Sequence, residues 1–411
     1  KCNYPMNKKN IWIFNQYAGD STSGWGERSF YLAEEFQKQN YDVTIFSGSQ
    51  NHLFTNNKNI NSSYEIRFDN NVRFVWIKTL KYYKSNGIKR VISWFIFIIK
   101  IFMVSKTNLP KPDYIIVSSM PMLPIFCAQY YKKKYQSKKL IFEVRDIWPL
   151  TLTEIGGKSR FNPFVILLSS IERYSYNKSD LIISVLKNCN LHIKKVTNNK
   201  FNFLWIPNGI KEKLTTGQVN VDIHSLLKLI PNDKFLIFYA GSLNKTNAMS
   251  YVVKAANMLK TNEKIHFVFV GEGDQKEYLK SISNSHNLTF IPKVPKHQLK
   301  LLISKASCYI ISWKNSKIYN YGVSPNKYAD YMLQGKPIIV ATNSKCDIVE
   351  EANCGLIARA QDHLSIVDKI TELLNFSEEK RKILGLNGLK YAQKNLLYEK
   401  LSLKYLKALE S

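Results

Sequence analysis

The sequence predicts an α/β protein made of two doubly wound parallel-sheet domains, and three observations lead to this prediction. Short apolar runs alternate with stretches of helical periodicity in both halves of the chain, a pattern typical of βαβ units and of parallel sheets flanked by helices. The turn signal Pro207-Asn208-Gly209 separates the two halves. The 411 residues, 45% of them hydrophobic, are enough for two or three domains with buried cores.

The first half begins with an apolar run at Ile11 to Asn15, a polar loop, a helical stretch from Phe30 to Gln39 and a strand from Val43 to Phe46. The segment 51–63 is rich in asparagine and is expected to be a loop. Further strands are expected at 73–77, 114–117, 140–144, 181–184 and 203–206. We therefore assign 6–210 to the first domain, with Met6 as a candidate start.

The second half repeats the alternation after a polar stretch that ends near Asp233. Strands are expected at 235–239, 266–270, 288–291, 308–311, 338–341 and 355–358, and a helix at 249–259. A long final helix is expected from about 378 to 409. We assign 211–393 to the second domain and expect 394–411 to pack back on the first.

The chain is unusually basic: it has 59 Lys and Arg and 31 Asp and Glu, which gives a net charge of +28. Such a surplus favours polyanionic partners such as nucleic acid, anionic lipid or phosphorylated substrates. The nucleic-acid alternative lacks a recognisable binding module, so no nucleic-acid partner is expected. The six cysteines form no C-x-x-C pair and are expected to be buried free thiols in a reducing compartment.

The longest apolar run, Val91 to Val104, has 14 residues and contains Lys100. A membrane-spanning helix needs ~20 apolar residues, so the run is not expected to span a bilayer. Twelve Lys or Arg and a single acid lie between residues 81 and 140, around this run and its aromatic side chains. An aromatic helix flanked by basic residues can lie in the headgroup plane of an anionic bilayer. We therefore expect a cytoplasmic protein attached peripherally to the inner face of the plasma membrane.

The strongest chemical signal is the segment from Tyr321 to Ile339, which contains the sequence Gly322-Val323-Ser324-Pro325-Asn326-Lys327. Gly322 and Pro325 predict a turn that opens a helix, and Gly335 predicts its end. Backbone N–H groups near Ser324 and the charge of Lys327 would form an anion site. Asp330 lies one turn further on, where a carboxylate can accept hydrogen bonds from vicinal hydroxyls. Phosphates at the helix start and a ribose beside it fit a nucleotide, although a capped helix with a solvated Lys and Asp is the plain structural alternative.

Other motifs accompany this segment in a fixed order. They are Gly24-Trp25-Gly26-Glu27-Arg28, Glu143-Val144-Arg145-Asp146-Ile147-Trp148-Pro149, Pro207-Asn208-Gly209, Tyr239-Ala240-Gly241-Ser242-Leu243-Asn244-Lys245 and Val270-Gly271-Glu272-Gly273. Together with Ser324-Pro325-Asn326-Lys327, they resemble family 4 retaining glycosyltransferases. The subgroup that this chain resembles has a G-x-S-P-N-K sequence and includes N-acetylfucosamine-type transferases of O-antigen and capsule assembly.

The resemblance implies a GT-B fold, in which two Rossmann-like domains face a central cleft. It implies that the first domain binds the acceptor and the second a nucleotide-sugar. The expected catalytic residues are Lys245, Lys327, Asp146 and Arg145. The expected donor-binding residues are Gly24, Gly26, Gly241, Ser242, Gly271, Gly273, Ser324, Pro325, Asn326 and Asp330.

One departure from the wider family concerns two glutamates that lie eight positions apart before the Gly-Lys-Pro turn. The second falls on Asp330, the position that typically binds the ribose. The first falls on Gly322, so the usual carboxylate contact to the donor sugar is missing. Arg145 and Asp146 also have a structural alternative as an ion pair, and the glycine pairs have one as ordinary turns.

The expected activity is that of a retaining, metal-independent hexosyltransferase without a cofactor. It would move an N-acetylated amino or deoxyamino sugar from UDP to a polyprenyl-diphosphate-linked saccharide in O-antigen or capsule synthesis. No D-x-D motif, Walker-type phosphate loop or complete G-x-G-x-x-G loop is present in the sequence. A UDP-N-acetylhexosamine 2-epimerase of the same fold remains the enzymatic alternative.

Overall fold

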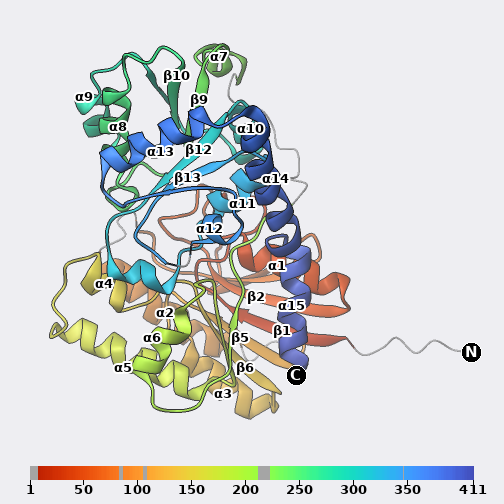
Figure 1. Cartoon of the computed structure of the whole chain (residues 1–411). Helices are drawn as coiled ribbons and strands as arrows, with labels where there is room; N and C mark the ends of the chain where they lie inside the picture. The colour runs from red at the N-terminus through yellow and green to blue at the C-terminus, as the bar shows by residue number, and fades with distance from the viewer. Residues whose placement is uncertain (1–7, 83–86, 105–108, 212–222, 346) are drawn as a thin grey trace, which may run out of the picture. The chain divides into compact units, whose positions relative to one another are not determined.

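The computed structural model describes residues 8–82, 87–104, 109–211, 223–345 and 347–411. The chain divides into two compact units, of which unit 1 is Lys1–Gly209 with Tyr398–Ser411 and unit 2 is Ile210–Leu397. Each unit has its own sheet flanked by helices (Figure 1). The candidate start Met6 and the thiols Cys2 and Cys346 lie outside the described residues.

Unit 1 has an eight-stranded sheet in the order β3-β4-β2-β1-β5-β6-β7-β8. All neighbouring pairs are parallel except β3 and β4. The strands are β1 (Lys9–Phe14), β2 (Tyr41–Gly48), β3 (Tyr64–Asp69), β4 (Val72–Ile77), β5 (Tyr114–Ser118), β6 (Lys139–Val144), β7 (Leu181–Ser184) and β8 (Phe203–Trp205). The order places β1 at the centre, so that the loop after it opens at the middle of the carboxyl edge.

Helices cover both faces of this sheet because successive strand side chains point to opposite sides. Ile11 and Ile13 of β1 pack in the cluster that contains α1 and α15, whereas Trp12 and Phe14 contact Tyr131 on α3. The helices of unit 1 are α1 (Arg28–Lys38), α2 (Ile88–Val104), α3 (Ile125–Tyr135), α4 (Leu150–Glu154), α5 (Pro163–Lys178), α6 (Cys189–Val196) and α15 (Tyr398–Glu410).

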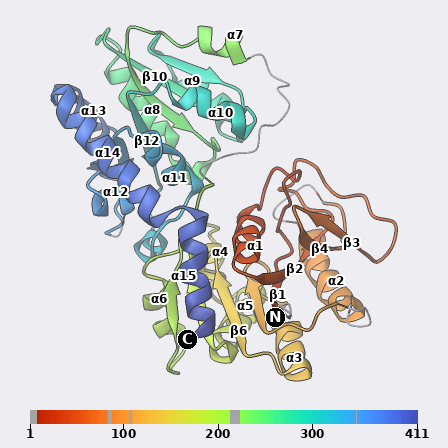
Figure 2. The same cartoon turned by 90° about the vertical axis from the view of Figure 1, so that its right-hand side faces the viewer.

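The C-terminal helix α15 lies beside α1 (Figure 2). The rings of Phe36 and Tyr405 are 5.4 Å apart, and the carboxylate of Glu410 accepts a hydrogen bond from Lys9 at 2.6 Å. The last helix of the chain is therefore part of unit 1, although it follows unit 2 in sequence.

Unit 2 has a six-stranded, fully parallel sheet in the order β11-β10-β9-β12-β13-β14. Its strands are β9 (Phe235–Ala240), β10 (Ile265–Val270), β11 (Leu288–Ile291), β12 (Cys308–Ser312), β13 (Ile338–Ala341) and β14 (Gly355–Ala358). Its α-helices are α7 (Ile223–Lys228), α8 (Met249–Met258), α9 (Lys276–Ile282), α10 (Lys296–Ile303), α11 (Asn326–Met332), α12 (Ile348–Glu351), α13 (His363–Asn375) and α14 (Glu378–Asn395), and two 3₁₀ turns are η1 (Lys245–Asn247) and η2 (Lys317–Tyr321).

Two expectations about the elements are wrong. The long final helix is two helices, α14 and α15, which are interrupted at Leu396 and Leu397. The first sheet is not wholly parallel, because the unforeseen strand β3 pairs antiparallel with β4 at its edge. The alternating sequence Tyr64-Glu65-Ile66-Arg67-Phe68-Asp69 explains the omission, since this half-exposed strand has no continuous apolar run.

The expectation of buried free thiols is confirmed for Cys127, Cys189, Cys308 and Cys354, and burial raises the pKa of each. None of the helices in the described part of the chain is long and apolar enough to cross a membrane.

Candidate functional site

The loops that follow β9 and β10 meet at the carboxyl edge of the unit 2 sheet. The N–H of Gly241 donates to the carbonyl of Val270 at 2.9 Å, and the N–H of Leu243 donates to the carbonyl of Glu272 at 2.9 Å. In open parallel sheets, ligands bind outside the carboxyl ends of the strands. The predicted donor residues Gly241, Ser242, Gly271 and Gly273 all lie in these two loops.

Gly271 and Gly273 are required by this close approach. A Cβ at Gly271 would lie 2.0 Å from the carbonyl oxygen of Gly241, and a Cβ at Gly273 would lie 2.1 Å from that of Leu243. Gly271 also has a φ of +152°, which L side chains rarely adopt. The two glycines thus have a structural role in joining the loops.

Lys327 reaches this edge from the first turn of α11. Its Nζ donates to the phenolic oxygen of Tyr239 at 3.1 Å and to Oδ1 of Asn247 at 3.3 Å. The ammonium also lies 4.4 Å from the ring centroid of Tyr239 and 5.5 Å from that of Trp313. A Cβ at Gly241 would be 3.2 Å from Nζ, so this glycine leaves room for the ammonium.

Burial lowers the pKa of Lys327 to about 7. Its hydrogen-bond partners in the described chain are neutral, a phenol and an amide, so they do not offset the cost of burying the charge. An anion bound beside Nζ would favour the charged form and raise this pKa. The surroundings of Lys327 are therefore those of an anion-binding group, whose charge a bound phosphate would compensate.

Tyrosines hold α11 against the end of β9. The hydroxyl of Tyr331 donates to the carbonyl of Ala240 at 3.0 Å, and the N–H of Ala240 donates back to the same hydroxyl at 2.7 Å. The rings of Tyr309 and Tyr331 stack with centroids 4.1 Å apart. These contacts fix the strand end and the helix that carries Lys327 relative to each other.

The predicted turn before α11 is present, with Pro325 as the extended N-cap residue and Asn326 as the first helical residue. Ser324 is partly buried and Asn326 is exposed. The helix has only seven residues and ends at Met332. Gly335, with a φ of +64°, lies in the turn that follows.

Lys245 and Ser242 are exposed, and Lys245 is in the 3₁₀ turn η1. Lys245 lines a separate, shallow pocket of about 250 Å³, together with Tyr251, Lys314 and Gln361. Asn247, two residues further on, is the residue of this turn that contacts Lys327. In the structure, Asn247 rather than Lys245 thus lies next to Lys327.

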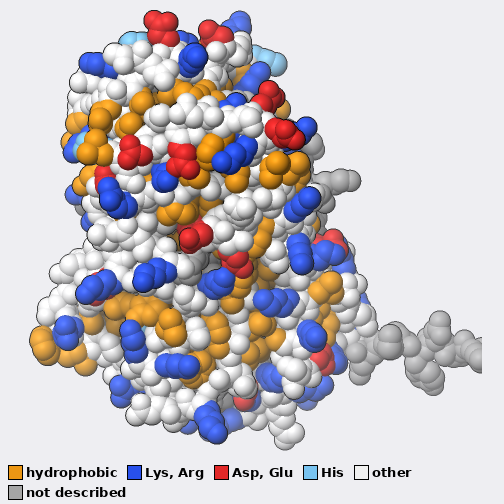
Figure 3. Space-filling view, in the orientation of Figure 1, with side chains coloured by type: hydrophobic (Ala, Val, Ile, Leu, Met, Phe, Trp, Pro, Cys, Tyr) orange, Lys and Arg blue, Asp and Glu red, His pale blue; other side chains and the backbone are white. Residues whose placement is uncertain are grey.

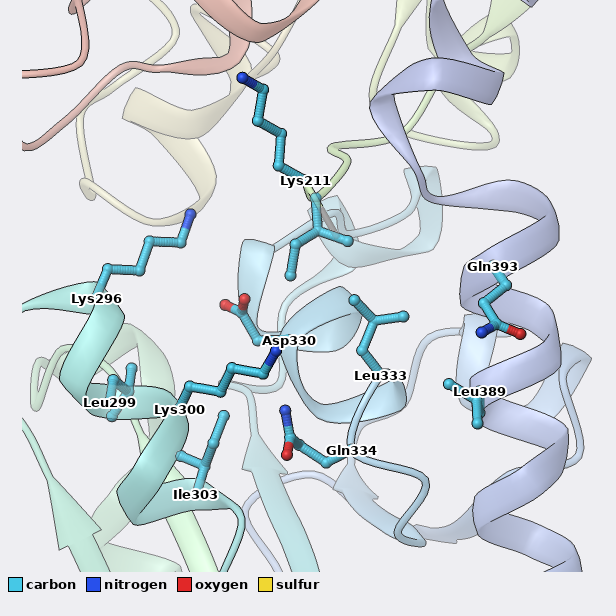
Figure 4. Close-up of a pocket in the computed structure, with 11 residues that line it drawn as sticks. Lys211, Lys296, Leu299, Lys300, Ile303, Asp330, Leu333, Gln334, Leu389 and Gln393 are labelled. Atoms are coloured by element: carbon cyan, nitrogen blue, oxygen red, sulfur yellow. The ribbon is translucent and has the colours of Figure 1, made fainter. Parts of the chain in front are cut away.

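Asp330 lines a pocket of about 200 Å³ between α10 and α11 (Figure 4). Lys296, Lys300 and Gln334 line the same pocket. In Figure 4 the side chain of Lys300 extends toward the base of Asp330, whose carboxylate points away from the Lys300 ammonium. A carboxylate and an amide beside two flexible cations can hydrogen-bond hydroxyl groups and attract an anionic ligand.

In unit 1, the loop between β1 and α1 contains Gly24 and Gly26, with φ values of +72° and +81°. A Cβ at Gly26 would lie 2.1 Å from the carbonyl oxygen of Tyr17, so the loop can close on itself only with glycine there. The N–H of Gly19 donates to the carbonyl of Gly26 at 3.2 Å and completes this closure.

A buried ion pair joins this loop to the end of β6. The Nε of Arg28 donates to Glu143 at 3.1 Å, and its terminal nitrogens donate to the carbonyls of Pro207 at 2.6 Å and Ile206 at 3.0 Å. Burial alone would raise the pKa of Glu143, but the guanidinium groups of Arg28 and Arg145 hold it below its usual value. One carboxylate thus lies near two arginines.

Arg145 and Asp146 do not have the environment of an ion pair with each other. Burial lowers the pKa of Arg145, while Glu143 opposes that shift. Asp146 is exposed and accepts hydrogen bonds from Trp148 Nε1 at 3.1 Å and Thr151 Oγ1 at 2.8 Å. The cation is therefore near the buried cluster and the carboxylate faces solvent.

Four side chains of these sites were not expected from the sequence: Tyr239, Asn247, Trp313 and Glu143. Each contacts a residue outside its own segment of the sequence, so no local pattern indicates the contact. The described residues also include no group of three or more His, Cys, Asp and Glu suited to a metal ion.

The fold defines the class of the protein. Each unit is a doubly wound sheet with its loops at the carboxyl edge, and this architecture is the expected GT-B fold. Sucrose-phosphate synthase from Thermosynechococcus elongatus is similar over 98% of both chains, with a TM-score of 0.74 and 13% identity. The Anabaena protein Alr3699/HepE in complex with UDP-glucose is similar over 98% of this chain and 99% of its own, with a TM-score of 0.65 and 10% identity.

Comparisons of the sequence with known proteins indicate the type of enzyme. Residues 227–391, most of unit 2, match the family described as "Glycosyl transferases group 1". The chain is also 22% identical over 248 residues to the "Putative colanic acid biosynthesis glycosyl transferase WcaI" of Escherichia coli (strain K12). This similarity spans 58% of the chain and 59% of the relative. Both findings support the expectation of a glycosyltransferase.

Proposed function

We propose that this protein is a retaining glycosyltransferase that transfers an N-acetylated amino or deoxyamino sugar from UDP to a polyprenyl-diphosphate-linked saccharide. The observation that carries the proposal is the Lys327 ammonium, which lies beside Gly241 with neutral partners and a pKa of about 7. The match of unit 2 to glycosyl transferases group 1 and the colanic acid relative support the reaction class and a role in surface-polysaccharide synthesis.

The donor would bind at the carboxyl edge of unit 2. Lys327 would contact the diphosphate, with Gly241, Ser242 and the Ser324-Pro325-Asn326 turn beside it, and Lys245 would approach from η1. Asp330 would accept hydrogen bonds from the ribose hydroxyls, and Gly271 and Gly273 would shape the loop near the base. The UDP-glucose bound to Alr3699/HepE supports the choice of nucleotide.

The chemistry needs charge stabilisation as the bond between the anomeric carbon and the diphosphate oxygen breaks. Lys327 and Lys245 would stabilise the negative charge that develops on the leaving diphosphate, without the need for a metal ion. With retention, the acceptor hydroxyl attacks the anomeric carbon on the face that the diphosphate leaves. The hydroxyl proton passes to a diphosphate oxygen, which balances the charges.

Unit 1 would supply the acceptor side. Arg145, the less neutralised arginine of the buried cluster, would attract the diphosphate of the acceptor, and Asp146 would orient the reacting hydroxyl. Gly24 and Gly26 would keep the first loop closed and narrow, so that its backbone can also approach the donor phosphates. The lipid of the acceptor implies that the protein works at the inner surface of the plasma membrane.

The proposal is tested by incubating the purified protein with UDP-sugars and a short-chain polyprenyl-diphosphate saccharide and measuring the glycosylated lipid and released UDP. Product that depends on both substrates supports the transferase. A changed sugar or released UDP without any acceptor would favour the epimerase, and a preference for GDP-sugars would overturn the choice of UDP.

A further inference from the structure

The helix α2 exposes an apolar stripe along its whole length. Large apolar side chains at heptad-like spacing are 38% to 77% exposed on one side of this 17-residue helix. They are Ile88, Ile92, Phe95, Ile99, Phe102 and Met103, which we call the α2 stripe. At about 1.5 Å per residue the helix is about 25 Å long, so the stripe is a long continuous surface.

Contacts on the opposite side hold α2 in this orientation. Nε1 of Trp94 donates to the hydroxyl of Tyr17 at 2.9 Å, and Nε2 of Gln16 donates to Oγ of Ser93 at 2.9 Å. Nε of Arg90 also donates to the Tyr17 hydroxyl, at 3.1 Å. Rotating the helix to bury the stripe would break these buried hydrogen bonds, so its exposure is built into the fold.

The stripe continues over the neighbouring helices through aromatic contacts. The rings of Phe102 and Tyr130 are 5.4 Å apart, which joins α2 to α3, and those of Phe126 and Tyr174 are 5.0 Å apart, which joins α3 to α5. Exposed apolar side chains also occur on and beside α5 and α6, where Figure 3 shows hydrophobic side chains bordered by Lys and Arg. The members of this second group are Phe161, Ile166, Leu167 and Leu191.

The charge of this layer differs from that of the opposite layer of the same sheet. Helices α2, α3 and α5 contain eight Lys or Arg and one acid, Glu172, which is buried and bonded to His192 at 2.7 Å. Helices α1 and α15 contain five Lys or Arg and four Glu, and Leu403 is their one strongly exposed large apolar side chain. One layer is therefore both apolar and cationic, whereas the other is close to neutral.

We propose that the α2 stripe and the α3 lysines dock on an anionic lipid bilayer, with α2 in the plane of the headgroups. An apolar face with basic neighbours and few acids is the composition that binds such a surface. A second copy of the same face fits poorly, because Lys133 and Lys134 would meet like charges across the seam. Docking does not depend on the proposed glycosyl transfer, and only the lipid identity of the acceptor rests on that function.

Lipid docking would also place the first loop of unit 1 near the bilayer. Tyr17 lies in the loop with Gly24 and Gly26, and it is bonded directly to Arg90 and Trp94 on the inner side of α2. These hydrogen bonds hold the loop against α2. A lipid-linked acceptor would reach that loop without leaving the membrane.

The test is flotation of the full chain with phosphatidylcholine vesicles, with and without one third phosphatidylglycerol, at low and high salt. We expect binding to anionic vesicles that weakens with salt, because the charges are exposed. Phe95→Gln with Ile99→Gln is expected to lower the partition coefficient more than ~10-fold, and Lys133→Gln with Lys134→Gln about 30-fold at low salt.

Matched controls lie in unit 2. Leu364→Gln with Ile383→Gln removes two equally exposed apolar side chains, and Lys260→Gln with Lys305→Gln removes two exposed charges. Neither pair is expected to alter flotation, and an unchanged far-UV circular dichroism spectrum and tryptophan fluorescence verify that unit 1 of the stripe variant is folded, because six of the seven tryptophans are in unit 1. Wild-type flotation of the stripe variant, equal binding to neutral vesicles, or a change of oligomeric state alone would overturn the proposal.

Discussion

Both units place a cation at the carboxyl edge of a parallel sheet, but the two cations have different surroundings. In unit 1 the guanidinium of Arg28 is bonded to Glu143 and to two backbone carbonyls. In unit 2 the ammonium of Lys327 is bonded to a phenol and an amide. A cation that is paired with a carboxylate therefore holds loops together, whereas a cation with neutral partners can pair with the charge of a bound ligand.

The difference extends to the way each edge is closed. Unit 2 joins its loops through backbone hydrogen bonds and the missing Cβ atoms of Gly271 and Gly273. Unit 1 joins its loop to β6 through a buried side-chain pair. The same doubly wound architecture is therefore closed at its carboxyl edge by backbone contacts in unit 2 and by a buried side-chain ion pair in unit 1.

The largest expected effect is on the stability of unit 1. Arg28→Met leaves Glu143 buried without its main partner, and removing one member of a buried pair costs about 3–5 kcal/mol. Denaturant unfolding followed by tryptophan fluorescence measures this, because six of the seven tryptophans are in unit 1. An unchanged unfolding curve would show that the pair is not structural.

Replacing the cation of unit 2 should instead affect catalysis. Lys327→Ala removes a charge beside the leaving diphosphate, which is expected to cost about 2.7–4 kcal/mol of transition-state stabilisation, or a ~100- to 1,000-fold lower turnover. Lys245→Ala should have a smaller effect because its side chain is exposed to solvent. Near-normal steady-state rates for both folded variants would remove the diphosphate assignment.

Asp330→Asn should separate binding from chemistry. The ribose does not change during the reaction, so the variant loses only a hydrogen bond that binds the donor. This loss is expected to weaken donor binding by about 1.5–3 kcal/mol, which raises KM for the donor with little change in kcat. Steady-state kinetics with varied UDP-sugar measure both constants. A lower kcat at an unchanged KM would place Asp330 at the reacting atoms instead.

Gly271→Ala tests how closely the loops after β9 and β10 pack at the carboxyl edge of the unit 2 sheet. The new methyl group would lie 2.0 Å from the carbonyl oxygen of Gly241, in a backbone region that alanine avoids. We expect a loss of about 1–3 kcal/mol in stability and weaker UDP binding. Thermal melting with and without UDP measures both. Gly157→Ala is the control for the steric contact alone, since Gly157 also has a positive φ, of +67°, but its Cβ would meet no atom within 4 Å. Equal melting temperatures for the two variants would contradict the close-packed loops.

The smallest expected effect is a pH dependence of donor affinity. Lys327 has a pKa of about 7 in the free protein, and a bound diphosphate would raise it, so binding takes up a proton above pH 7. Affinity should be nearly constant below about pH 6, fall about twofold from there to pH 7, and fall about fivefold from pH 7 to pH 8. Calorimetry with UDP-N-acetylglucosamine measures this. The same slope in Lys327→Ala would assign it to another group.

The sequence predicts most of the fold because buried strands leave a local pattern. Leu288–Ile291, Ile338–Ala341 and Gly355–Ala358 are strands with the expected bounds, since each is a short apolar run next to turn residues. Strand β3 is not predicted because its polar and apolar residues alternate, and its middle residues 66–68 are all exposed. The break between α14 and α15 was missed because Leu396 and Leu397 carry no Gly or Pro signal.

The candidate site is only partly predictable for the same reason. Lys327 and Asp330 belong to a contiguous motif, and the sequence identifies both. Tyr239 and Asn247 contact Lys327 across 88 and 80 residues, and no local pattern predicts such a contact. The surroundings that lower the pKa of Lys327 are a property of the tertiary structure alone.

The most direct test of the central claim is calorimetric titration of UDP, GDP and dTDP into the wild-type protein and Lys327→Ala at pH 7. If the carboxyl edge of unit 2 holds a UDP-sugar through Lys327, UDP binds the wild type at one site and more tightly than GDP or dTDP. The variant then binds UDP at least ~10-fold more weakly, as expected from the loss of one charge-assisted contact. Equal UDP affinity in the two proteins, or no binding of UDP to the wild type, would contradict the account.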